Sequence, residues 1–209
     1  MANTKRFGVL KARLKQLRTS LLPKVYSPTG YYNQATLDKA RGFRLLAHAE
    51  FESFLEDIIR LYVAKSVMAW NTRKKTSTPL LCILASYPGA ELINNYSKYP
   101  AKTPITLSTL INKSFVHFEH NVTNNNGVRT ENVLSLLVQV GLNDTLIDSV
   151  WLGTVDAFGA HRNVVAHNTG AVGFVSYQTD PKTTEIEALS ICDGLRDLDE
   201  RLRQMYQRI

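Results

Sequence analysis

Cysteine is scarce in this chain of 209 residues, which has only Cys82 and Cys192, far apart in the sequence. Two distant cysteines in apolar surroundings exclude a disulfide framework and a cysteine-based zinc site, and they fit a reducing compartment. The chain also lacks any apolar run approaching the roughly 20 residues of a membrane-spanning helix. No secretory signal is apparent, so we expect a cytoplasmic protein that makes no use of a membrane.

Proline is missing from residues 34–70, where apolar residues recur at the spacing of one helix face. These apolar residues include Leu37, Phe43, Leu46, Ala47, Phe51, Phe54, Leu55, Ile58, Leu61 and Tyr62. A helix of this length is usually the spine of a helical bundle. Repeats, low-complexity tracts and interdomain linkers are missing as well. We therefore expect a single domain over residues 1–209, with a basic N-terminal helix and loop at 1–30 and a bundle at 31–209.

Acidic residues are outnumbered, with 18 Asp and Glu against 25 Lys and Arg, which gives a formal net charge of +7. This balance favours a polyanionic partner such as nucleic acid, although a basic surface kept for solubility is the alternative. The N-terminal segment 9–22 places leucines at helical spacing between lysines and arginines. A packed helix with a solvated cationic face is the favoured interpretation of this segment. The other interpretation is a footprint for a phosphate backbone.

Further helices are expected from apolar spacing and turn residues, at 79–87, 107–121, 130–140, 145–167 and 184–207. Thr130 and Asp144 stand where the caps of two of these helices are expected. Apolar and polar residues alternate weakly over residues 172–177, so one minor strand pair is possible there. The predicted fold class is all-α, a helical bundle with long antiparallel helices.

Arg162 and His167, separated by four residues, fall at the end of the helix expected at 145–167. Residues four apart on a helix stack on one face, which places Asn163 beneath His167. The planar guanidinium of arginine suits a phosphate, and histidine can give or take a proton near neutral pH. The alternative is structural, because the helix dipole favours cations at a helix C-terminus.

Arg44, His48 and Glu52 are spaced four residues apart on the long helix and share one of its faces. A ladder of ion pairs on the surface is the favoured interpretation of such a row. The alternative is that the row belongs to a functional site.

A metal site is not predicted. His117 and His120 have the spacing of a ligand pair, but a metal ion needs further ligands and none is obvious. An acidic cluster with magnesium spacing is also missing near the arginine-histidine pair, so we expect no cofactor.

The segment from Arg162 to His167 resembles the signature of the HEPN superfamily, in which an arginine is followed after a few residues by a histidine. Asn163 fills the position after the arginine, which is often polar. Residues 47–56 look like the leading helix of the RiboL-PSP type of HEPN domain. The resemblance spans the chain from about residue 36 to about residue 207, and it implies a HEPN-like helical bundle.

The resemblance also implies a metal-independent endoribonuclease of the toxin or phage-defence type, which acts on RNA as a homodimer. An antitoxin or an associated defence protein is a further candidate partner. Arg162 and His167 would be the catalytic pair, with Asn163 in support. The leading helix would lie beside the motif helix, where Glu52 and His48 could orient the pair. A non-catalytic HEPN-like module that binds RNA or a protein is the alternative.

The expected dimer would pair two motif helices, because each chain supplies only one histidine for proton transfer. Gly159 and Ala160 would let two backbones approach closely there, with ordinary packing inside one chain as the alternative. Some HEPN toxins carry a tyrosine two residues after the histidine, which a partner nucleotidyltransferase modifies. Thr169 stands at that position, which argues against this form of control here.

Overall fold

The computed structural model of the protein describes residues 4–90, 106–167 and 179–207, with the side chains at 90, 163–167 and 207 outside the description. Within these ranges the secondary structure is helical and no strand occurs. The predicted all-α fold class is therefore confirmed. Residues 172–177, where the sequence allows one minor strand pair, lie outside the part of the chain that the structure describes. None of the described helices is both long and apolar enough to cross a membrane.

The spine of the fold is α2 (Gln34–Arg73), a helix of 40 residues and therefore about 60 Å long. Asn33 caps its start, because the asparagine side chain accepts a hydrogen bond from the Thr36 backbone N–H at 2.9 Å. Lys74 ends it in the left-handed conformation, with a φ of 54°. The long helix predicted at 34–70 is confirmed and extends to Arg73.

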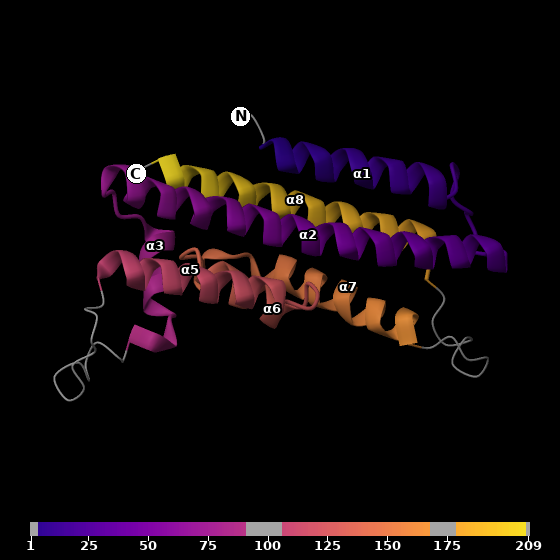
Figure 1. Ribbon diagram of the computed structural model, residues 1–209. Helices are drawn as coiled ribbons and strands as arrows, with labels where there is room; N and C mark the ends of the chain where they lie inside the picture. Colours follow the sequence, from indigo (N-terminus) through magenta and orange to yellow (C-terminus); the bar gives the residue numbers. More distant parts are fainter. Residues whose placement is uncertain (1–3, 91–105, 168–178, 208–209) are drawn as a thin grey trace.

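The other elements pack around α2, as Figure 1 shows. They are α1 (Lys5–Leu21), α3 (Thr78–Ala85), η1 (Pro88–Ala90), α5 (Leu107–Thr123), α6 (Thr130–Val138), η2 (Asp144–Leu146), α7 (Ser149–His167) and α8 (Pro181–Gln207). α1, α2 and α8 lie side by side in one layer, and α3, α5, α6 and α7 form the other. α1, α5 and α7 run antiparallel to α2, whereas α8 runs parallel to it.

Aromatic rings fill the core. Phe51 of α2 and Phe158 of α7 are fully buried, with ring centroids 5.7 Å apart. About one turn further along α2, Phe54 meets Phe7 of α1, with ring centroids 5.8 Å apart. α1 also buries three leucines, Leu10, Leu14 and Leu17. Each such side chain stabilises the fold by roughly 1.5–3 kcal/mol, so α1 is part of the same core, in agreement with the packed-helix interpretation.

The motif helix α7 begins later than predicted. Ser149 is its first residue, and Asp148 caps it by accepting a hydrogen bond from the Val150 N–H at 2.8 Å. Asp144, the predicted cap, instead opens the short 3-10 turn η2. Both aspartates precede the apolar pattern of α7, and that pattern alone could not decide between them.

Candidate functional site

Arg162 lies near the C-terminal end of α7, whose last residue is His167. Its side chain is partly buried, and its positive charge acts on His48 and Glu52 of α2. The side chains of Asn163 and His167 lie outside the described part of the chain. Arg162 is therefore the motif residue around which the site can be built.

His48 is only 3% exposed. Burial, assisted by the positive charge of Arg162, lowers the pKa of His48 to about 4. The imidazole is therefore neutral at neutral pH. Its ring lies against Gly127, where an added Cβ would stand 3.5 Å from Cε1 and 3.6 Å from Nε2. A side chain longer than a methyl group at position 127 would press on the ring.

Arg44 is 4% exposed, and its guanidinium lies over the ring of Phe158 at 4.5 Å from the centroid. Nη2 donates to Glu187 of α8 at 2.5 Å, whereas Nε and Nη1 are buried without a hydrogen-bond partner among the described residues. The electron-rich face of the Phe158 ring attracts and so stabilises this buried cation. The predicted surface ladder of Arg44, His48 and Glu52 is therefore wrong. Other elements of the fold bury the side chains of Arg44 and His48.

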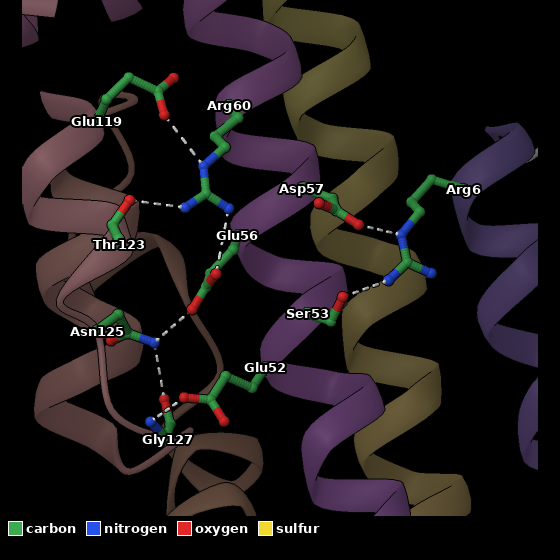
Figure 2. Close-up of polar contacts among 10 residues, drawn as sticks. All are labelled: Arg6, Glu52, Ser53, Glu56, Asp57, Arg60, Glu119, Thr123, Asn125 and Gly127. Carbon is green, nitrogen blue, oxygen red and sulfur yellow. Dashed lines mark hydrogen bonds and ion pairs between the residues drawn. The ribbon is translucent and has the colours of Figure 1, made fainter. Parts of the chain in front are cut away.

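Glu52 is partly buried and accepts a hydrogen bond from the backbone N–H of Gly127 (Figure 2). Its Oε2 lies 3.9 Å from Nδ1 of His48. Burial raises the pKa of Glu52, while the Gly127 N–H and the charge of Arg162 act in the opposite direction. Gly127 has a φ of 106°, which glycine adopts without strain. This conformation lets the turn between α5 and α6 direct an N–H at the carboxylate.

A polar network fastens that turn to α2 (Figure 2). Arg60 donates to Glu56 at 3.1 Å and to Glu119 of α5 at 3.2 Å. Asn125 donates to Glu56 at 3.4 Å and to the carbonyl of Gly127 at 3.1 Å. Gly127 is therefore held in place against the face of α2 that carries the site.

One carboxylate fixes α7 to the start of α6. Asp156 accepts two hydrogen bonds from Arg129 and one from the Thr130 backbone N–H, each at 3.2 Å. The cap of α6 therefore comes from a neighbouring helix, and the prediction that the Thr130 side chain supplies it is wrong. Arg129 also covers Gly159, where an added Cβ would stand 3.2 Å from the arginine Cγ. Gly159 thus packs inside its own chain, as the alternative interpretation of this residue expects.

The two histidines of α5 are bonded locally. His117 pairs with Asn121 at 3.2 Å, and His120 pairs with Asn124 at 2.9 Å. Among the side chains that the structure describes, no three from His, Cys, Asp or Glu are grouped so that they could hold a metal ion.

The described site therefore combines the guanidinium of Arg162, the carboxylate of Glu52 and the neutral imidazole of His48. Sequence reasoning named these three residues but missed Gly127, whose only signal is the asparagine-rich turn in which it stands. No family model, curated protein or solved structure matches this chain. The function is therefore inferred from these side chains and from the resemblance of the motif.

Proposed function

We propose that the protein is a metal-independent endoribonuclease of the HEPN type, in the toxin or phage-defence class, with Arg162 and His167 as its catalytic pair. The observation that carries this proposal is that α7 packs through Phe158 on Phe51 and Arg44 of the long helix, and that beside this contact the charge of Arg162 acts on His48 and Glu52. The net charge of +7 also suits an RNA substrate.

The reaction uses the nucleophile that RNA itself carries, the 2′-hydroxyl beside each phosphate. Its attack forms the O2′–phosphorus bond and breaks the phosphorus–O5′ bond, leaving a 2′,3′-cyclic phosphate and a 5′-hydroxyl. His167 is assigned the proton transfers, a contribution of typically about 10²–10⁴-fold in rate. The guanidinium of Arg162 is assigned the nonbridging oxygens, where negative charge grows in the transition state.

His48 and Glu52 are assigned positioning roles. His48 has a pKa of about 4, so at neutral pH it has no acidic proton to give, and its buried ring has little room for contact with RNA. Glu52 is assigned the orientation of the Arg162 guanidinium, because the positive charge of Arg162 acts on its carboxylate. Asn163 keeps its supporting role beside the catalytic pair.

A homodimer would bring two arginines and two histidines to one cleft, since each chain supplies a single motif histidine. Two-fold dimers are the commonest oligomers. We place the reaction in the cytoplasm, with an antitoxin or an associated defence protein as a further partner. Contacts to RNA phosphates should make binding weaken steeply with salt.

Analysis of the products tests this proposal. A defined RNA incubated with the protein in EDTA should acquire 2′,3′-cyclic phosphate and 5′-hydroxyl ends. The same RNA carrying 2′-O-methyl groups should stay intact. A strict requirement for magnesium, or products with 5′-phosphates, would contradict the mechanism. Salt-sensitive RNA binding without cleavage would favour the alternative, a non-catalytic HEPN-like binding module.

A further inference from the structure

α1 and α8 lie next to each other in antiparallel directions (Figure 1) and are tied together at two points. At one end, the Thr4 backbone N–H donates to Asp199 at 3.2 Å. At the other, Arg18 donates to Glu185 at 3.1 Å, and the hydroxyl of Tyr26 donates to the same carboxylate. The two ties on α1 are 14 residues apart, which corresponds to about 21 Å of helix.

Between these ties the two helices leave a slot of about 340 Å³. This volume lies in the range of about 300–1,000 Å³ that is usual for small-molecule sites. Its apolar lining comes from three helices, with Phe7 and Leu14 from α1, Phe43 from α2, and Ala188, Leu189 and Cys192 from α8. Leu189 is 55% exposed and stands at the mouth, whereas the other five are buried.

The α1 rim of the slot carries two exposed cations, Lys11 and Lys15. Neither forms an ion pair with any residue that the structure describes. Lys11 lies near the thiol of Cys192: burial raises the pKa of that thiol to about 11, and the charge of Lys11 opposes this effect. On the α8 rim, Arg196 is already paired with Asp193 at 3.2 Å. The positive charge without a partner is therefore concentrated on one side of an apolar slot.

We propose that this slot binds a small anionic amphiphile, with its apolar tail along the lining and its carboxylate or phosphate head against Lys11 and Lys15. A partner helix fits less well, because the ties at both ends prevent a long segment from sinking into the slot. An uncharged apolar molecule would form no ion pair with Lys11 and Lys15. The site is separate from the arginine-histidine motif, and the proposal does not depend on the ribonuclease assignment.

Calorimetric titration of the full chain tests this proposal with four probes of equal tail length: decanoate, decyl phosphate, decanol and decyltrimethylammonium. Decanoate and decyl phosphate should bind, with whichever binds more tightly identifying the head group. Decanol should bind at least about tenfold more weakly, and the cation should not bind. Replacing both rim lysines by glutamine should weaken binding of the anions about five- to tenfold, whereas Lys182→Gln, an exposed site elsewhere on α8, should have no effect.

A second pair of variants tests the slot itself. Leu189→Glu places a negative charge at the mouth and should abolish binding of the anions. Ile186→Glu makes the same type of change on the same helix, at a residue that is 57% exposed and does not line the slot, and should leave binding intact. The lysine variants carry the test if Leu189→Glu fails to fold. The proposal is overturned if neither anion binds, if decanol binds as tightly, or if Ile186→Glu abolishes binding as well.

Discussion

Replacing His48 by glutamine should remove a large part of the acid sensitivity of folding. The pKa of His48 is about 4 in the folded protein, against an ordinary value of 6.5. The unfolded chain therefore takes up this proton at a higher pH than the folded chain, and stability is lost as the pH falls from 6.5 towards 4. At 1.36 kcal/mol per pKa unit, the full loss is about 3 kcal/mol, of which about 2 kcal/mol falls between about pH 7.5 and pH 5.

Urea unfolding at these two pH values measures the effect. Over this interval the wild-type protein should lose about 2 kcal/mol more stability than His48→Gln. The matched control is His120→Gln, because His120 is exposed on α5 and its replacement should preserve the wild-type pH dependence. Equal pH dependence in the wild type and in His48→Gln would refute the conclusion that α2 carries a buried, neutral imidazole.

Three further predictions concern the same site. Glu52→Gln should lower RNA cleavage roughly tenfold while changing the free energy of unfolding by less than about 1 kcal/mol. The glutamine amide can still accept the hydrogen bond from the Gly127 N–H, but it lacks the negative charge on which Arg162 acts. No change in either quantity would make Glu52 a packing residue. Gly127→Ala should cost about 1–2 kcal/mol in urea unfolding, because a residue with a side chain is strained at its φ of 106°. Gly153→Ala, in open space on α7, should instead stabilise by up to about 1 kcal/mol. Equal effects would contradict the need for glycine in this turn. Mixed Arg162→Ala and His167→Ala protomers should regain some cleavage if a working site takes one residue from each chain. Light scattering that found only monomers of the fully active enzyme would contradict the dimer.

The extent of α2 could be predicted because the features that determine it are local: apolar spacing, the absence of proline and the residues at its ends. The position of a side chain around a helix is also local, so the sequence correctly placed Arg44, His48 and Glu52 on one face. Whether water or another element covers that face depends on packing between distant segments, such as the contact of Phe158 with Arg44. The surface ladder was predicted wrongly for this reason.

Contacts between distant residues had no signal in the sequence. Asp156 caps α6 from 26 positions away, and Glu52 binds Gly127 across 75 positions. Gly159 likewise gave no sign of whether its own chain or a second one covers it. The proximity of Arg162 to Glu52 was expected, but only from the resemblance to a family in which the leading helix lies beside the motif helix.

Cleavage of RNA in the presence of EDTA, compared between the wild type and variants of Arg162 and His167, tests the proposed catalytic pair most directly. Arg162→Ala and His167→Ala should each abolish cleavage while circular dichroism and the urea midpoint stay at wild-type values. Arg162→Lys should also lose most activity, because an ammonium group cannot make the two parallel hydrogen bonds of a guanidinium. Arg73→Ala, at an exposed position at the end of α2, is the control and should cleave normally. Full cleavage by a folded Arg162→Ala or His167→Ala variant would contradict the assignment.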